Sequence, residues 1–168
     1  MLVILSGLPG VGKTAVARGL ARAIGALHIR IDSIEQACRA GAPSLPMNDL
    51  GYRVGYAVAE DNLGLGLTVI ADCVNPIRLT RDAWLSVAKR AGVKSIEVEI
   101  TCSVVEEHRR RVEGRTSDIP GFTMPTWGDV MAREYDAWER EHLVMDSATS
   151  SVDESVRVIC AAISGCES

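Results

Sequence analysis

Long apolar runs are missing from this chain of 168 residues. A membrane-spanning helix needs roughly 18–20 consecutive apolar residues, and no run in the sequence approaches that length. The first residues, Met1–Ser6, are apolar, but no basic head precedes them and a glycine-rich segment follows at once. That pattern excludes a secretory signal peptide and indicates a buried strand instead. We therefore expect no membrane contact and a cytoplasmic location.

Clustered metal ligands are also missing. The odd number of cysteines forms no C-x-x-C pair: Cys38, Cys73, Cys102, Cys160 and Cys166. The histidines, His28, His108 and His142, lie far apart in the sequence. Neither set has the spacing of a zinc site built from protein ligands alone. We interpret the cysteines as small buried residues of a reducing compartment.

Positive charge is scarce. Lysine and arginine total 18 against 22 acidic residues, which gives a net charge of −4. Proteins that hold nucleic acid through many phosphates usually have a basic face or stripe. We therefore do not expect nucleic acid to be the partner, although a local basic groove can exist in an acidic chain.

Strand-like and helix-like segments alternate along the whole chain, without repeats or a long linker. With 47% apolar and 24% charged residues, the composition is that of one globular domain over residues 1–168. Strands are expected at Leu2–Leu5, Leu27–Ile31, Leu67–Ala71, Ile96–Ile100 and His142–Met145. Helices are expected between and after them, with N-terminal caps at Asn48, Ser103, Thr126 and Ser151, and with Trp84, Tyr135 and Trp138 at helical spacing in the core. This order predicts an α/β fold with three αβα layers around a five-stranded parallel sheet.

A complete phosphate-binding pattern follows the first strand. Residues 7–14, GLPGVGKT, match G-x-x-x-x-G-K-[ST] between a buried strand and an amphipathic helix. Glycines there let backbone N–H groups converge on phosphate oxygens at a helix N-terminus. Lys13 would neutralise the β- and γ-phosphates, and the Thr14 hydroxyl is placed to bind Mg²⁺. The absence of an N-K-x-D guanine signature favours ATP over GTP. We assign nucleotide contacts to Gly7, Pro9, Gly10, Val11, Gly12, Lys13, Thr14 and Ala15.

A carboxylate, Asp32, follows the second strand. Transfer of a phosphoryl group to a hydroxyl needs a residue that orients the acceptor and takes its proton. Asp32 can do both at the carboxyl end of a strand. The alternative is that Asp32 caps a helix that begins at Ser33. The two roles are compatible.

Polar residues also follow the third strand. Asp72 could bind Mg²⁺ through water or hold the acceptor, since ligands of doubly wound sheets bind at the carboxyl ends of strands. Asn75 could donate to the acceptor, or it could simply form a turn with Pro76. Arg53 lies on a helix that could wall the acceptor pocket, although packing also explains that helix.

An arginine-rich segment precedes a stretch rich in turns. Arg111 and Arg115 are four residues apart on one helical face, and Pro120, Phe122, Pro125 and Trp127 follow. We expect residues 111–127 to form a mobile lid whose arginines neutralise the transferred phosphoryl group. The alternative is a solvated helix with Glu–Arg pairs.

Four segments taken together resemble a known family: GLPGVGKT, RIDSIEQA, VIADCVNP and RRRVEGR. The chain is similar, from about Leu2 to Trp138, to the AAA_33-like P-loop kinases related to polynucleotide kinase. Gluconate kinase, chloramphenicol phosphotransferase and zeta-type toxin kinases are looser relatives. The resemblance implies a five-stranded parallel sheet, MgATP as donor, Asp32 as general base and Arg111 or Arg115 as the lid arginine.

The predicted function is therefore ATP-dependent phosphorylation of a hydroxyl on a small molecule. We assign acceptor contacts to Asp32, Glu35, Arg53, Asp72 and Asn75. In polynucleotide kinases an arginine stands three residues after the aspartate, where this chain has Glu35, and this difference argues against an anionic polynucleotide. The alternatives are a kinase for the 5′-hydroxyl of an oligonucleotide and a nucleotide-binding module without an acceptor.

Overall fold

The structure, a computed structural model, describes residues 1–44 and 46–167. Its strands are β1 (Leu2–Ser6), β2 (Leu27–Arg30), β3 (Val69–Asp72), β4 (Ser95–Thr101) and β5 (Leu143–Asp146). Its helices are α1 (Lys13–Ile24), α2 (Ile31–Gly41), α3 (Leu50–Gly64), α4 (Arg78–Arg90), α5 (Val105–Gly114), α6 (Trp127–Met131) and α7 (Val152–Glu167). This element order confirms the α/β class predicted from the sequence. Among the described residues, no helix is long and apolar enough to cross a membrane.

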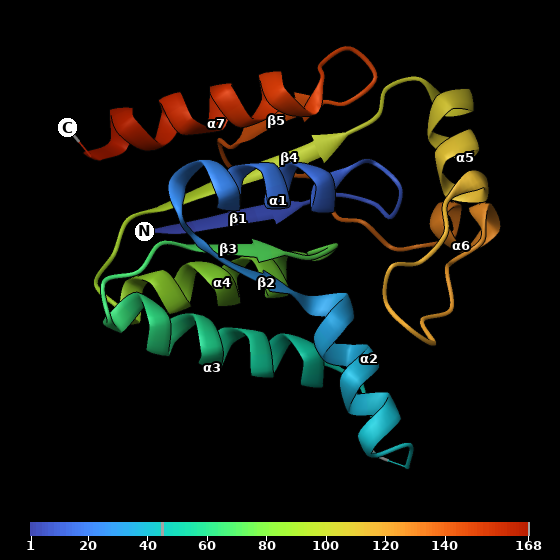
Figure 1. Ribbon diagram of the computed structural model, residues 1–168, viewed down its shortest axis with the longest axis horizontal. Helices are drawn as coiled ribbons and strands as arrows, with labels where there is room; N and C mark the ends of the chain where they lie inside the picture. The colour runs from blue at the N-terminus through green and yellow to red at the C-terminus, as the bar shows by residue number, and fades with distance from the viewer. Residues whose placement is uncertain (45, 168) are drawn as a thin grey trace.

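All strands of the sheet are parallel, in the order β2-β3-β1-β4-β5. Helices α1 and α7 cover one face, and α3 and α4 cover the other, so the molecule has three layers (Figure 1). The strands point their carboxyl ends toward α5 and α6 in the figure. The loop after β1 therefore opens at the edge of the sheet where ligands of doubly wound folds bind.

Alternation along β1 builds two cores. Val3 and Leu5 pack with α1 and α7, whereas Leu2 and Ile4 pack with α3 and α4 around the fully buried Trp84. All five residues of β1 are buried, as expected for a central parallel strand. Burial on this scale stabilises each large apolar side chain by roughly 1.5–3 kcal/mol. The rigid centre of the sheet fixes the position of the loop that follows.

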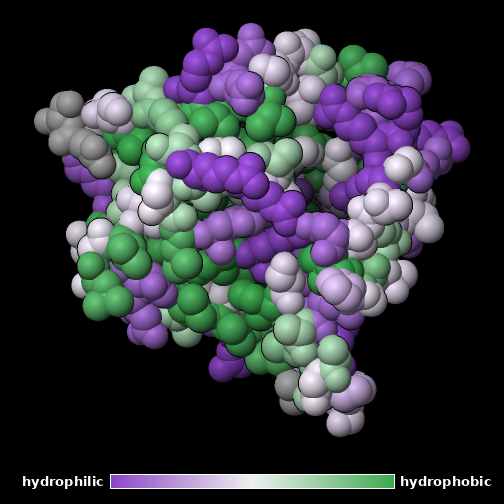
Figure 2. Space-filling view, in the orientation of Figure 1, coloured by the Kyte–Doolittle hydropathy of each residue, from purple (hydrophilic) through white to green (hydrophobic). Residues whose placement is uncertain are grey.

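Side chains of different character gather on different parts of the surface. Figure 2 shows hydrophilic side chains over α5 and in a band across the middle of this face, and apolar ones toward the lower left, over α3. The exposed apolar residues include Val58, Leu65 and Leu67.

Two predicted caps are correct and two are wrong. Thr126 caps α6 with a reciprocal bond to Asp129, and Ser151 pairs in the same way with Glu154. Helix α3 instead begins after Asp49, with no side-chain cap. Ser103 does not cap α5, because its hydroxyl donates to Asp146 at 2.6 Å. A partner distant in the sequence competes with the local one in that case.

Three further expectations are corrected by the structure. Helix α2 begins at Ile31, so Asp32 lies in the first helical turn and is not its N-cap. Tyr135 and Trp138 belong to an irregular segment, where both rings pack on the Arg81 guanidinium. Of the cysteines, Cys73 is buried and the others are partly exposed.

Candidate functional site

The loop after β1 has a backbone that requires glycine. Gly7, Gly10 and Gly12 have φ angles of 139°, 90° and 103°, which L-residues with side chains rarely adopt. A Cβ at Gly7 would lie 2.2 Å from the Ile100 carbonyl oxygen, and one at Gly10 would lie 2.5 Å from Val112 Cγ2. The loop is therefore packed closely from behind, while Gly10 and Gly12 line the cleft on its other side, where backbone N–H groups can converge on a ligand.

Lys13 is the first residue of α1, and its ammonium group is buried. Its Nζ donates to the Leu8 carbonyl at 2.9 Å, across the loop. Burial lowers the pKa of Lys13, although the negative charges of Asp72 and Asp32 oppose that effect. A ligand with several negative charges would stabilise this buried cation further, as would the partial positive charge of the helix N-terminus.

Asp72 ends β3, is buried, and interacts electrostatically with Lys13. Its Oδ2 lies 3.1 Å from His28 Nε2, on the neighbouring strand β2. Burial raises the pKa of Asp72, but hydrogen bonds from His28 and Thr14 and the Lys13 charge outweigh it, so the net shift is downward. Asp72 is thus held as a carboxylate beside the Thr14 hydroxyl. Sequence analysis missed His28, since only the strand pairing brings it to Asp72.

Helix α2 carries two acids toward the same cleft, one in its first turn and one just after it. Asp32 and Glu35 both line it, and Asp32 acts electrostatically on Lys13 and on Arg115. Glu35 Oε2 accepts a hydrogen bond of 3.0 Å from Arg39. Burial raises the pKa of Glu35, and the nearby Arg39 only partly compensates.

The two predicted lid arginines both line the cleft, but they differ in their hydrogen-bond partners. Arg111 is tethered by Glu107 and by the Ser147 hydroxyl and carbonyl, at 2.8–3.0 Å. Arg115 Nε is buried without a hydrogen-bond partner among the described residues. Burial lowers the pKa of Arg115, and Asp32 opposes that shift.

The segment between α5 and α6 is tied to the body of the protein. Asp118 accepts hydrogen bonds from Arg30, at 2.8 Å, and from Arg18. Gln36 on α2 reaches the Pro120 carbonyl at 3.4 Å. These contacts place residues 115–125 over the cleft. The contacts are exposed to solvent, so water can readily replace each partner.

The cleft has a volume of about 1380 Å³. It brings together most of the predicted site residues: Pro9, Gly10, Gly12, Lys13, Thr14, Ala15, Asp32, Glu35, Asp72, Arg111 and Arg115. Phe122 also lines it, whereas Trp127 packs edge-on against His108 outside. Four predicted residues lie off its lining: Gly7 and Val11, which are buried behind the loop, Asn75, which is buried, and Arg53, which faces solvent.

Asn75 supports the cleft wall from behind. It has a left-handed φ of 51°, and its amide donates to Ser6 Oγ at 3.0 Å. Its backbone N–H donates to the Tyr52 hydroxyl at 2.9 Å. Through this bond the loop after β3 is joined to α3, and Tyr52 is fixed at the cleft.

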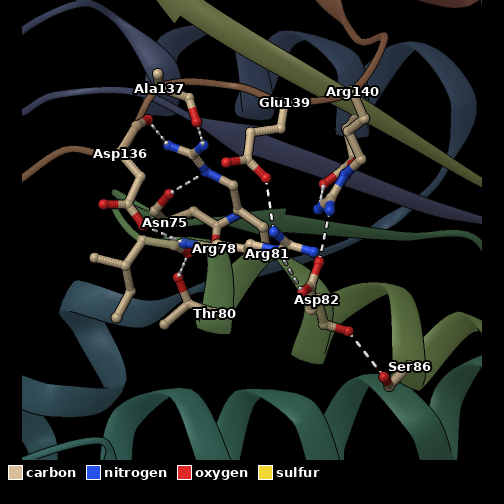
Figure 3. A network of polar contacts seen from close by, with 12 residues as sticks. Asn75, Arg78, Thr80, Arg81, Asp82, Ser86, Asp136, Ala137, Glu139 and Arg140 are labelled. Atoms are coloured by element: carbon tan, nitrogen blue, oxygen red, sulfur yellow. Dashed lines mark hydrogen bonds and ion pairs between the residues drawn. The ribbon is translucent and has the colours of Figure 1, made fainter.

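Arg81 anchors the same loop from α4. It is 2% exposed and donates to four carbonyls, those of Asn75, Pro76, Asp136 and Ala137 (Figure 3). No motif indicated this role, because the acceptors are backbone carbonyls, two of them in the loop just before α4 and two in a segment more than 50 residues away.

His108 is a second residue that sequence analysis missed. It lies on α5, is buried, and donates from Nε2 to the Pro9 carbonyl at 2.8 Å. Together with Val112, it packs α5 against the phosphate-binding loop at Gly10. The helix that leads into the predicted lid is thereby coupled to that loop.

The residues present fit a nucleoside triphosphate and Mg²⁺. The donors nearest the loop, the Thr14 hydroxyl and the Asp72 carboxylate, are the hard oxygen groups that Mg²⁺ prefers. Among the described residues, no group of three acidic, histidine or cysteine side chains could hold a metal without further ligands. A magnesium ion here would therefore take its remaining ligands from phosphates and water.

Comparison with known proteins identifies the family and the fold. The sequence model of the AAA_33 family, described as an AAA domain, matches residues 2–126. No curated protein sequence matches the chain. The APS kinase CysC of Mycobacterium tuberculosis, solved with AMPPNP and APS, superimposes over 97% of this chain and 96% of its own, with 20% identity and a TM-score of 0.73.

Two other solved structures show the same fold. The superposition on a gluconokinase from Sinorhizobium meliloti 1021 covers 98% of this chain and 91% of the gluconokinase, at 21% identity and a TM-score of 0.64. The superposition on Kti12 from Chaetomium thermophilum, solved with ADP-AlF3, covers 97% of this chain and 99% of Kti12, at 22% identity and a TM-score of 0.70. These likenesses establish the fold of P-loop kinases for the chain, including its five-stranded parallel sheet.

Proposed function

The chain belongs to the AAA_33 family of AAA domains, and on that premise we propose that it is an ATP-dependent kinase for a small hydroxyl compound. The observation that carries the proposal is the shared cleft of Lys13, Asp32 and Asp72. A phosphate-binding loop alone would fit any nucleotide-binding protein. A carboxylate beside the place of the γ-phosphate adds what transfer to a hydroxyl requires.

In this mechanism the loop binds and orients the triphosphate. The N–H groups of Gly10 and of residues 12–14, together with the Lys13 ammonium, hold the β- and γ-phosphates. Thr14 and Asp72 would hold Mg²⁺, which when bound neutralises charge on the phosphate oxygens. His28 keeps the Asp72 carboxylate in place.

Asp32 acts on the acceptor. Its carboxylate takes the proton from the acceptor hydroxyl while the hydroxyl oxygen bonds to the γ-phosphorus. The bond between that phosphorus and the β–γ bridging oxygen breaks, and ADP leaves with the electron pair. Arg115, whose Nε lacks a partner among the described residues, stabilises the charge on the transferred group. The lid of residues 111–127 excludes water during the step.

The test is ADP release measured with a panel of sugars, nucleosides and antibiotics. D32N should lower acceptor-dependent turnover by at least about 100-fold, because a general base typically contributes 10²–10⁴-fold. Its dissociation constant for MgATP should stay within about threefold of the wild-type value. The matched control is D61N, which removes an exposed acid on α3 outside the cleft. Equal turnover in D32N and D61N would refute the assignment of the base.

An oligonucleotide acceptor is tested in the same assay with a short RNA and a short DNA. Acceptor-dependent ADP release that weakens as salt rises would identify such a kinase. Tight MgATP binding without turnover on any acceptor would indicate a nucleotide-binding module instead.

A further inference from the structure

The peptide bond between Pro9 and Gly10 lies in the phosphate-binding loop, and glycine leaves its orientation open. Gly10 has a φ of 90°, and a half-turn of this peptide would give φ a negative value. Glycine adopts values of either sign with similar ease, so the residue itself does not decide which way the peptide faces. A contact from outside the loop has to fix it.

His108 on α5 makes that contact. Its Nε2 lies 2.8 Å from the Pro9 carbonyl oxygen. Because a carbonyl oxygen only accepts hydrogen bonds, Nε2 carries the hydrogen and donates it. His108 is only 6% exposed, and a hydrogen bond shielded from water is stronger than an exposed one. The orientation of the Pro9–Gly10 peptide is therefore held by a side chain almost 100 residues away in the sequence.

The ring of His108 is itself held by its neighbours. One turn further along α5, Val112 reaches the same glycine: a Cβ added to Gly10 would lie 2.5 Å from Val112 Cγ2 and 3.5 Å from His108 Nε2. Trp127 of α6 packs edge-on against the histidine ring, with the ring centroids 5.1 Å apart. His108 thus has little freedom to release the Pro9 carbonyl.

The orientation of this peptide decides where the Gly10 N–H points. The described residues contain no cis peptide bond, and in a trans peptide the C=O and N–H groups point in opposite directions. Because the Pro9 carbonyl faces His108, the Gly10 N–H faces away from it. Pro9 and Gly10 line the cleft, whereas His108 lies behind them, off its lining. Within the described part of the chain the Gly10 N–H forms no hydrogen bond, so it is available to a ligand.

We propose that His108 is a positioning residue for the nucleotide, which holds the Pro9–Gly10 peptide so that the Gly10 N–H donates to a phosphate oxygen. The inference rests on the nucleotide binding that the kinase function proposed above requires. His108 touches no ligand itself and acts only through the backbone of the loop. Without its hydrogen bond the peptide is free to turn, and the loop then presents a carbonyl oxygen to the phosphate in place of an N–H donor.

Two variants separate the hydrogen bond from the packing of the ring. H108F keeps a flat ring against Trp127 but has no donor, whereas H108Q has no ring but keeps an N–H donor. In calorimetry H108F should bind MgAMPPNP at least about tenfold more weakly than the wild type, since one hydrogen bond to a charged acceptor contributes about that factor. H108Q should stay within about threefold of the wild type, because the Pro9 carbonyl keeps a donor.

The matched control is His142, a second histidine that bonds a backbone carbonyl and packs on a tryptophan. Its Nδ1 lies 3.0 Å from the Arg140 carbonyl oxygen, and its ring stacks on Trp138, outside the cleft. H142F loses a bond of the same kind and should bind MgAMPPNP as the wild type does.

The amide of Gly10 reports the orientation of the peptide directly. Only Gly10 and Gly121 follow a proline in the sequence, so labelling with ¹³C-carbonyl proline and ¹⁵N-glycine selects two amide signals in NMR spectra. The signal that is lost in G121A identifies the other one as that of Gly10. In the wild type MgAMPPNP should move the Gly10 amide proton downfield, as its N–H donates to phosphate. H108F should lose most of this shift even at saturating nucleotide.

Three results would overturn the inference. The first is a wild-type protein that binds MgAMPPNP without a downfield shift of the Gly10 proton, a result that does not depend on the folding of any variant at position 108. The second is equal affinity in H108F and the wild type. The third is equally weak binding in H108F and H108Q, since the ring and not its donor would then be required. Failure of the wild type to bind MgAMPPNP would instead overturn the kinase function, so the two failures are distinguishable.

Discussion

Replacing Arg81 by methionine should destabilise the protein by about 3 kcal/mol. Methionine is of similar length but has no donor, so the four carbonyls that Arg81 serves lose a partner. A buried acceptor left without a partner costs about 1–3 kcal/mol. The Asn75 carbonyl would bear this cost in full, whereas the Pro76 carbonyl still accepts the Asp136 N–H at 2.8 Å.

Loss of the aromatic contacts adds to this effect. The Arg81 guanidinium carbon lies 4.1 Å from the Trp138 ring centroid and 5.0 Å from that of Tyr135. A cation–π contact of this kind contributes about 0.5–2 kcal/mol. Together the terms give about 3 kcal/mol, a large share of the 5–15 kcal/mol typical of a domain.

Urea unfolding followed by tryptophan fluorescence measures this change. R81M should lower the midpoint without changing the slope, since the area exposed on unfolding stays the same. R81K keeps the charge over the rings and should lose about half as much. R90M, which removes the exposed Arg90–Glu60 pair, should leave the midpoint almost unchanged. A loss below about 1 kcal/mol in R81M would refute the view that Arg81 anchors the loop.

Three other outcomes follow from the site. G10A should weaken MgATP binding at least about tenfold in calorimetry, because its Cβ meets Val112 at a φ of 90°. The control G64A, whose Cβ meets nothing within 4 Å and which lies outside the cleft, should bind MgATP normally. The pKa of Asp72 is lower in the folded than in the unfolded chain. The carboxylate therefore stabilises the fold fully above about pH 4, and this stabilisation is lost as the pH falls through the folded pKa. Urea midpoints measured from pH 6 to pH 3 should fall less steeply in D72N than in wild type. D118N should speed proteolytic cleavage of residues 115–125, because Arg18 and Arg30 lose their partner, and an unchanged rate would argue against a tethered lid.

Local patterns in the sequence predicted the parts of the site that depend on neighbours along the chain. The strand, glycine loop and helix over residues 2–24 needed only periodicity and one motif, and the structure places them as expected. Asp32 and Asp72 were found because the carboxyl ends of parallel strands meet at one edge of the sheet.

The residues that sequence analysis missed act through partners far away in the chain. His28 meets Asp72 only through strand pairing, and His108 meets Pro9 only because α5 packs on the loop. The helix expected through Tyr135 and Trp138 does not form, since both rings pack on Arg81 instead. Periodicity cannot distinguish aromatic residues in a helix from aromatic residues stacked on a distant arginine.

Calorimetric titration of MgATP into the folded protein tests the central claim most directly. The account predicts saturable uptake of one nucleotide per chain, and a dissociation constant at least about tenfold weaker in K13A, where the buried ammonium at the loop is gone. A correctly folded sample that takes up no MgATP, or a K13A variant that binds as tightly as the wild type, would contradict it.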